Sequence, residues 1–103
     1  MESNKITLCI TGAAGNIAYS LIPMVVSGQL FGPRTSIDLT LLDLPATEAV
    51  LKGISMELID GAYNLLSSCV YSTDPKVTFK QADVVIFLGG SARKPGQERR
   101  DLL

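Results

Sequence analysis

The stretch that decides the fold is ITLCITGAAGNIA, residues 6–18. Its first part, Ile6–Ile10, is β-branched or apolar without clean alternation, which is typical of a strand covered on both faces. Thr11 and Gly12 end this apolar run, and apolar residues at helical spacing follow from Asn16 onward. The stretch therefore predicts a buried strand, a tight turn and a helix, in that order.

The turn between this strand and helix, GAAGNIA at 12–18, has the composition of a phosphate-binding loop. Small residues let a pyrophosphate approach the backbone, and the N-terminus of a helix favours its negative charge. The pattern GxGxxG is incomplete, because Ala14 stands where a glycine is expected. A tight turn that needs glycine only for a positive φ explains the same residues, so the turn alone leaves both interpretations open.

An acidic residue at the end of the next predicted strand, Ile37–Asp43, favours dinucleotide binding. A doubly wound dinucleotide-binding fold places a carboxylate there, where it accepts hydrogen bonds from the adenosine ribose. Asp43 follows Gly12 by 31 residues, which is longer than usual, and the turn-rich segment 28–36 accommodates the excess. The alternative is a solvated acid beside Pro45, and the glycine turn upstream makes ribose binding the better interpretation.

The rest of the chain alternates predicted strands with predicted helices. We expect helices over 16–29 and 46–66, further strands over 37–43, 69–73 and 83–88, and a short helical or irregular link over 79–82. Pro23 should bend the first helix. The second helix is apolar on two sides, so it needs two packing partners. This alternation predicts an α/β fold with a parallel sheet, helices on its faces and right-handed crossovers.

Composition and charge narrow the class of protein. The chain has 103 residues, 47% of them hydrophobic, and a net charge of −1, which fits one globular domain and provides no field that would attract nucleic acid. Its longest apolar runs are too short to span a membrane. Cys9 and Cys69 lie in apolar segments and the chain has no His, so neither a disulfide nor a metal site is expected. An N-terminus without signal or transit character predicts a cytoplasmic location.

Four of the nine basic residues lie between Arg93 and Arg100, in a polar segment that follows the last predicted strand. This segment leaves the carboxyl end of the strand, which is the edge where open α/β sheets bind ligands. Guanidinium groups suit carboxylates, so Arg93 and Arg99 are candidate substrate-binding residues. A solvated, charged loop is the alternative.

Four motifs resemble the N-terminal part of the malate dehydrogenases, and they are most similar to the cytosolic-type branch of that family. They are TGAAGNIAYSLIPM at 11–24, LLDLP at 41–45, MELIDGA at 56–62 and ARKPGQERRDLL at 92–103. The resemblance covers nearly the whole chain in the family's order and spacing. The departures are mild: Ser91 and Ala92 precede Arg93 where a proline is common, and Asn16 stands where that branch often has glutamine.

The resemblance implies a Rossmann-like, doubly wound parallel sheet whose first four strands lie in the order 3-2-1-4, with NAD as the cofactor. The cofactor-binding residues that it implies are Gly12, Ala14, Gly15, Asn16, Ile17, Asp43, Gly89 and Gly90. Arg93 and Arg99 match the two arginines that hold a dicarboxylate, and Asp43 should disfavour the additional phosphate of NADP. The family likewise implies a homodimer formed through the helix at 46–66.

The family's proton-transfer pair, a His oriented by an Asp, has no counterpart in these residues, since the chain has no His. We therefore interpret residues 1–103 as the first part of a dinucleotide-binding domain, truncated and inactive by itself. The expected activity is that of an NAD-dependent oxidoreductase of the tricarboxylic acid cycle that interconverts malate and oxaloacetate. Two alternatives stay open: a lactate-like dehydrogenase for another 2-hydroxy acid, and a non-catalytic nucleotide-binding module. Arg93 argues against the lactate-like enzyme, because a monocarboxylate offers a second cation no partner.

Overall fold

The structure is a computed structural model that describes residues 4–88. It contains a four-stranded parallel sheet in the order β3-β2-β1-β4. The strands are β1 (Asn4–Thr11), β2 (Thr35–Leu42), β3 (Leu66–Ser72) and β4 (Val84–Ile86), and the helices are α1 (Asn16–Val26), the 3-10 helix η1 (Pro45–Thr47), α2 (Glu48–Asp60) and α3 (Pro75–Gln81). The alternation of elements and the strand order confirm the predicted Rossmann-like α/β fold.

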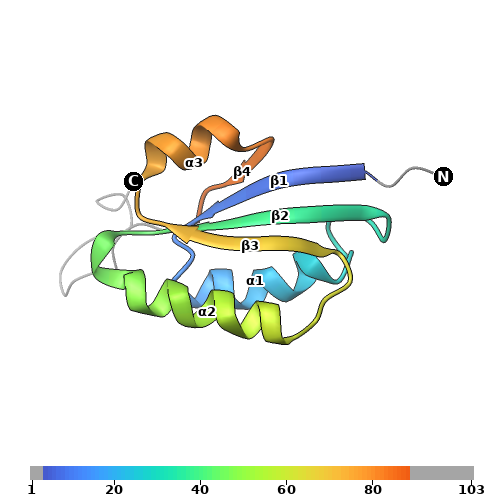
Figure 1. The fold of residues 1–103 in the computed structure, drawn as a ribbon, viewed down its shortest axis with the longest axis horizontal. Coiled ribbons are helices and arrows are strands. Elements are labelled where there is room, and N and C mark those ends of the chain that lie inside the picture. Colours follow the sequence, from blue (N-terminus) through green and yellow to red (C-terminus); the bar gives the residue numbers. More distant parts are fainter. Residues whose placement is uncertain (1–3, 89–103) are drawn as a thin grey trace.

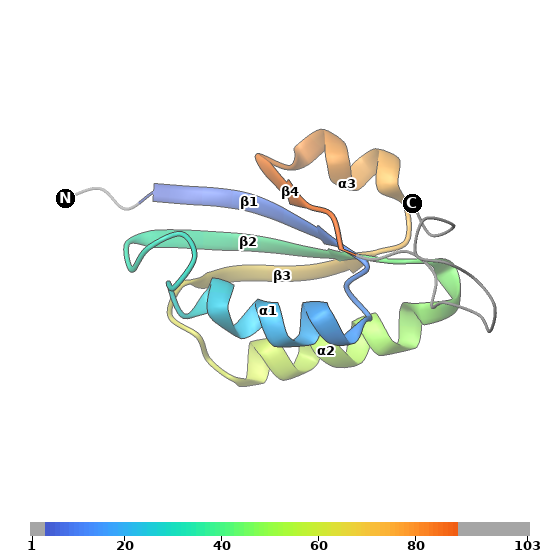
Figure 2. The same ribbon diagram turned by 180° about the vertical axis from the view of Figure 1, so that it is seen from behind.

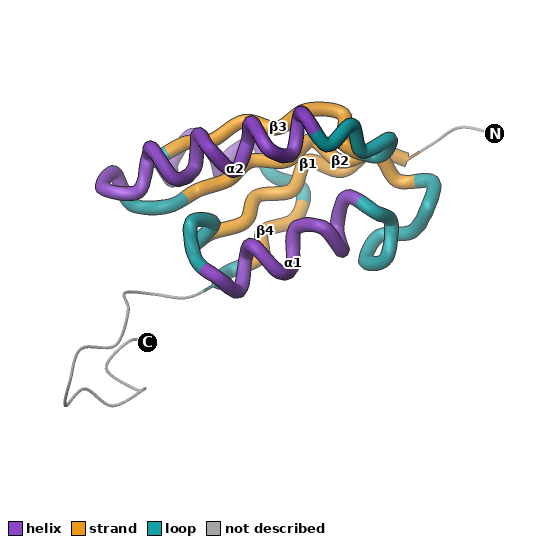
Figure 3. Tube along the Cα trace, turned by 90° about the horizontal axis from the view of Figure 1, so that it is seen from below, coloured by secondary structure: helices purple, strands orange, loops and turns teal. Residues whose placement is uncertain are grey.

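Helices cover the two faces of the sheet unequally. α1 and α2 lie on one face and α3 lies on the other (Figures 1 and 2). Seen from the side of α1 and α2, α2 runs along β3 while α1 lies nearer β4 (Figure 3). Because every strand pair is parallel, all carboxyl ends of the strands meet at one edge of the sheet. The strand-to-helix turns collect at that edge.

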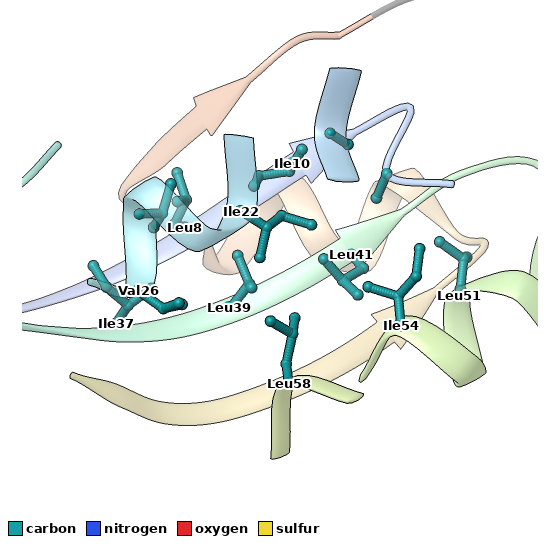
Figure 4. Close-up of a cluster of buried hydrophobic side chains, with 13 residues drawn as sticks. Leu8, Ile10, Ile22, Val26, Ile37, Leu39, Leu41, Leu51, Ile54 and Leu58 are labelled. Atoms are coloured by element: carbon teal, nitrogen blue, oxygen red, sulfur yellow. The ribbon is translucent and has the colours of Figure 1, made fainter. Parts of the chain in front are cut away.

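The hydrophobic core lies between the sheet and helices α1 and α2. In the register of β1 and β2, Leu8 pairs with Leu39 and Ile10 pairs with Leu41, and all four side chains are fully buried. Figure 4 shows these side chains facing the apolar residues of the two helices, Ile22, Val26, Leu51, Ile54 and Leu58. Cys9, which points to the opposite face, is also buried. The central part of β1 is therefore covered on both faces, as its sequence predicted.

The long helix predicted over 46–66 is wrong in its extent. Residues 45–47 form η1, α2 ends at Asp60, and the chain then turns through Ala62, whose φ is 53°. A residue with a positive φ cannot continue a right-handed helix. Leu66 opens β3. The apolar residues after 60 that match helical spacing thus belong to a turn and to the next strand.

The link predicted over 79–82 is the end of a longer helix, α3. Asp74 caps this helix, because its side chain accepts a hydrogen bond from the N–H of Lys76 at 3.0 Å. Pro75 occupies the first helical position, where its missing N–H costs nothing. An acidic cap followed by proline is a helix-start pattern that the sequence analysis missed.

The first helix also ends earlier than predicted. α1 contains Pro23 and ends at Val26 rather than near residue 29, and the chain then passes through Gly28 and Gly32, whose φ values are 90° and 94°.

Within residues 4–88, none of the helices is long and apolar enough to cross a membrane.

Candidate cofactor-binding site

A groove opens at the carboxyl ends of the parallel strands. Its volume is about 550 Å³, within the range of roughly 300–1,000 Å³ that is usual for small-ligand sites. The turn after β1 and the start of α1 form one side of it, and the other described segments that line it contribute Leu42, Asp43, Leu44, Pro45, Thr73, Pro75, Phe79, Phe87 and Leu88. The groove therefore lies at the edge where doubly wound sheets bind their ligands.

Gly12 sets the course of the turn after β1. Its φ is +63°, in the left-handed region that residues with a side chain rarely adopt. A Cβ atom at this position would lie 2.1 Å from the carbonyl oxygen of Leu88. Backbone conformation and the close approach of the chain after β4 both require glycine here, so Gly12 by itself says nothing about a ligand.

Gly15 differs from Gly12 in this respect. It has φ −86° and ψ 167°, a conformation that any residue adopts, and an added Cβ would meet only the carbonyl oxygen of Gly12, at 3.3 Å. Its own N–H donates to that carbonyl at 3.0 Å and closes the turn. A side chain at this exposed position would press on the backbone of the turn, and it would also stand between the turn and a ligand in the groove, so both the fold and a bound pyrophosphate favour glycine here.

The N-terminus of α1 is open toward the groove. Gly15 is the N-cap, no side chain caps the helix, and its first turn contains no acidic residue. The first hydrogen bond of the helix runs from the N–H of Tyr19 to the carbonyl of Gly15, at 3.1 Å. The N–H groups of Asn16, Ile17 and Ala18 therefore have no acceptor inside the helix. Such a group of amides, at the positive end of the helix dipole, suits a phosphate.

Asp43 lies directly after β2 and brings a carboxylate into the same groove. Its Oδ2 accepts a hydrogen bond from the N–H of Ala14 at 2.9 Å, and its Oδ1 accepts one from the N–H of Leu44 at 2.7 Å. Asp43 is the one charged residue among the described residues that line the groove. The predicted acidic residue and the predicted glycine turn thus lie in direct contact.

The end of β4 closes the groove from the other side. The N–H of Leu88 donates to the Thr11 side-chain oxygen Oγ1 at 3.0 Å, which continues the attachment of β4 to β1 beyond the paired residues. The carbonyl oxygen of Leu88 lies against Gly12. The N–H of Leu88 therefore holds the chain after β4 to Thr11, and its carbonyl packs against the turn at Gly12.

Sequence analysis missed one part of the groove, its aromatic wall. Phe79 on α3 and Phe87 after β4 lie with ring centroids 5.7 Å apart and an interplanar angle of 52°. Phe87 is 73% exposed, and both rings line the groove. The cap at Asp74 and Pro75 could have identified α3, and with α3 the position of Phe79.

The structure describes six of the eight residues that the sequence assigned to the cofactor. Gly12, Gly15, Asn16, Ile17 and Asp43 all line the groove. Ala14 contributes to the site through its N–H, which donates a hydrogen bond to Asp43. Gly89, Gly90, Arg93 and Arg99 lie outside the described residues.

The chemistry of the groove fits a nicotinamide dinucleotide. The uncapped N–H groups at the start of α1 are donors for a pyrophosphate, and the Asp43 carboxylate is an acceptor for ribose hydroxyls. Apolar side chains that follow β2, belong to α3 and follow β4 offer surfaces for flat rings. Asn16 and Ile17 are exposed, so the donors are accessible.

Solved structures that are similar to this chain over nearly its whole length include three dehydrogenases. A malate dehydrogenase from Naegleria fowleri matches with a TM-score of 0.89 and 36% identity, covering 99% of this chain and 31% of that one. A lactate dehydrogenase from Trichomonas vaginalis in complex with NADH and oxamate matches with a TM-score of 0.85 and 42% identity, covering 94% of this chain and 29% of that one. An apo variant of the Trichomonas vaginalis lactate dehydrogenase matches with a TM-score of 0.83 and 43% identity, covering 97% and 30%.

The chain spans about a third of the length of these structures. Its residues 5–103 match the family described as lactate/malate dehydrogenase, NAD binding domain. The cofactor predicted from the sequence, NAD, is the one in that description, so this prediction is confirmed. With its strand order, glycine turn and terminal acid in the positions described above, this chain belongs to the NAD-binding domain family of the lactate and malate dehydrogenases.

Proposed function

We propose that residues 1–103 form the first part of the NAD-binding domain of a dehydrogenase that interconverts malate and oxaloacetate. One observation carries the cofactor assignment: the uncapped N-terminus of α1 and the Asp43 carboxylate line one groove, and a 2.9 Å hydrogen bond from Ala14 joins the carboxylate to the turn that leads into α1. In this proposal the amides of Asn16 and Ile17 hold the pyrophosphate, and Asp43 accepts from the adenosine ribose.

NAD bound in the groove supplies the hydride acceptor for oxidation of a 2-hydroxy acid. The residues of this chain bind and orient. The glycine turn fixes the middle of the dinucleotide, Asp43 fixes its adenosine end, and Gly89 and Gly90, which follow Leu88 in the sequence, lie beside the nicotinamide end in this proposal. The hydroxyl proton of the substrate needs a base, and the His expected for that role is not among these residues.

Cofactor choice tests the assignment of Asp43. The 2′-phosphate of NADP would face this carboxylate with like charge, so full-length protein should bind NAD more tightly than NADP. Calorimetric titration with both cofactors measures the ratio. Asp43→Asn should bring the two affinities closer together, because it removes the repulsion between the carboxylate and the 2′-phosphate. Equal binding of the two cofactors by the unchanged protein would refute the role of Asp43.

The substrate assignment rests on Arg93 and Arg99. Oxaloacetate differs from pyruvate by a second carboxylate, which pairs with the Arg93 guanidinium in a charge-assisted and bidentate bond. Arg93→Gln should therefore lower kcat/KM for oxaloacetate by a large factor, whereas the value for pyruvate falls little or rises. Arg99→Gln serves as the comparison, since it should depress both. An equal loss for the two substrates in Arg93→Gln would contradict the charge-matching role.

Lactate is the second candidate substrate, and one observation favours it. The lactate dehydrogenase structures match at 42% and 43% identity, whereas the malate dehydrogenase matches at 36%. Turnover of malate and of lactate by the same full-length preparation separates the two. A protein that binds NAD and oxidises neither substrate would instead be the non-catalytic module.

We also propose that the full-length protein forms a homodimer through α2. On this helix Val50, Met56 and Ile59 are apolar and 50%, 55% and 60% exposed. Ile59→Glu should then weaken the dimer in sedimentation experiments, because it places a charge in an apolar contact. Val77→Glu is the matched control: Val77 is 54% exposed, but it lies on α3, across the sheet from α2. A dimer unaffected by Ile59→Glu would rule out this surface.

A further inference from the structure

Asp43 makes two hydrogen bonds that a residue needed only for ribose would not require. Its Oδ1 accepts from the N–H of Leu44 at 2.7 Å, which fixes the carboxylate relative to its own backbone. Its Oδ2 accepts from the N–H of Ala14 at 2.9 Å, in the middle of the glycine turn. The carboxylate therefore ties the end of β2 to the turn that follows β1.

Besides the contacts of Leu88 with Thr11 and Gly12, two backbone hydrogen bonds support the turn. The N–H of Ala13 donates to the carbonyl of Leu42 at 3.1 Å, and the N–H of Gly15 donates to the carbonyl of Gly12 at 3.0 Å. Among residues 4–88, Asp43 is the one side chain that accepts a hydrogen bond from the backbone of the turn. Without it, the half-buried N–H of Ala14 would lose its acceptor, which is costly in a folded protein.

The charge of Asp43 makes this arrangement informative. A carboxylate beside a pyrophosphate site repels the ligand, and this cost is offset by the ribose contact and by any support that the carboxylate gives to the turn. Hydrogen bonds from amides to an ionised acceptor are stronger than those to a neutral acceptor. An ionised side chain thus holds the turn more firmly than an amide or a hydroxyl would at the same position.

We propose that Asp43 is a positioning residue for the cofactor pyrophosphate, acting through the Ala14 amide to hold the turn in its binding conformation before the cofactor arrives. This inference rests on the proposed NAD-binding function. The carboxylate keeps its ribose role at the same time, because each oxygen has a second acceptor site beyond the one that the backbone uses. One residue then couples the sites for the ribose and for the pyrophosphate.

Binding of a nucleotide without ribose hydroxyls separates the two roles. If Asp43 serves the ribose alone, its removal leaves the affinity for such a nucleotide unchanged, or raises it, since a repulsive charge is gone. If Asp43 holds the turn, its removal weakens the binding of every diphosphate nucleotide, because only a fraction of the protein keeps the competent turn. The ribose role alone thus predicts no loss of affinity for this nucleotide, whereas the turn-holding role predicts a loss.

The experiment compares full-length protein with its Asp43→Asn variant, using ADP and dideoxyadenosine diphosphate, which lacks both ribose hydroxyls. Asp83→Asn is the matched control: Asp83 also accepts a backbone N–H through Oδ2, from Thr7 at 2.9 Å, but it does not line the groove. Asp43→Ser replaces Asp43→Asn should the latter fail to fold. Hydrogen exchange at the Ala14 amide, measured without nucleotide, reports on the turn itself.

We expect Asp43→Asn to weaken dideoxyadenosine diphosphate by about tenfold, to weaken ADP by more, and to speed exchange at Ala14. Asp83→Asn should leave both affinities unchanged. An unchanged or tighter affinity of Asp43→Asn for dideoxyadenosine diphosphate, or unchanged exchange at Ala14, would overturn the positioning role while leaving the proposed function intact. Unchanged protein that bound neither nucleotide would instead refute the proposed function, and the pyrophosphate role with it.

Discussion

Replacing Gly12 by alanine should destabilise the protein and weaken cofactor binding, because this residue meets two separate demands. Its φ of +63° places it in the left-handed region, and an added Cβ would lie 2.1 Å from the Leu88 carbonyl oxygen. The left-handed conformation costs a residue with a side chain roughly 1–2 kcal/mol. The overlap with Leu88 forces the backbone to move, which costs roughly a further 1–3 kcal/mol by comparison with overpacked cores. The expected loss in free energy of unfolding is therefore about 2–5 kcal/mol.

Gly32→Ala is the control that separates these two costs. Gly32 has a φ of +94°, yet a Cβ there would meet nothing within 4 Å. It should lose only the conformational part, roughly 1–2 kcal/mol. Urea unfolding of full-length protein, followed by circular dichroism, measures both variants, and NAD titration should show a loss of affinity in Gly12→Ala alone. Equal destabilisation by the two substitutions would show that the contact with Leu88 does not constrain the turn.

Three further predictions concern residues away from the groove. Gly53 lies inside α2 with open space around its position, so Gly53→Ala should raise the free energy of unfolding by about 0.5–1 kcal/mol, and a decrease on urea titration would show a hidden contact. Burial alone would raise the pKa of Asp38, but hydrogen bonds from Ser68 and Lys5 and the charge of Lys5 lower it overall. The stabilisation from Asp38 is therefore present above its ordinary pKa and disappears as the pH falls through the lowered value. In the Asp38→Asn variant, the free energy of unfolding should fall less steeply as the solution is made acidic. Burial raises the pKa of Cys69 to about 11, so alkylation by iodoacetamide in mildly alkaline solution should be much slower in native than in urea-unfolded protein, and equal rates would contradict the burial.

Much of the fold could be predicted from the sequence because parallel strands covered on both faces leave continuous apolar runs. Ile6–Ile10 and the apolar residues of 83–88 show such runs, and both segments contain strands of the sheet. Periodicity failed where the same apolar spacing continued through a turn. Ala62 keeps the helical spacing, yet its positive φ is incompatible with a right-handed helix. No pattern of apolar residues reports a backbone angle.

The site was predictable in composition but not in contacts. The sequence identified the glycine turn and Asp43 as parts of one site because each residue type matches a chemical need of a dinucleotide. The hydrogen bond from Ala14 to Asp43 depends on the in-register pairing of β1 with β2, which brings Thr11 beside Leu42. Spacing along the chain does not determine that register. The aromatic wall was missed for a similar reason, since Phe79 reaches the groove only through the position of α3.

The attachment of Leu88 has a consequence for how two ligands would influence each other. Its N–H donates to Thr11 and its carbonyl lies against Gly12, so both backbone groups of this residue contact the turn. A displacement of Leu88 on substrate binding would then be transmitted to the turn through these two contacts. Cofactor and substrate affinities should then be thermodynamically linked, each ligand tightening the other by the same factor. A loosened attachment, as in Thr11→Ala, would reduce that factor for both ligands alike.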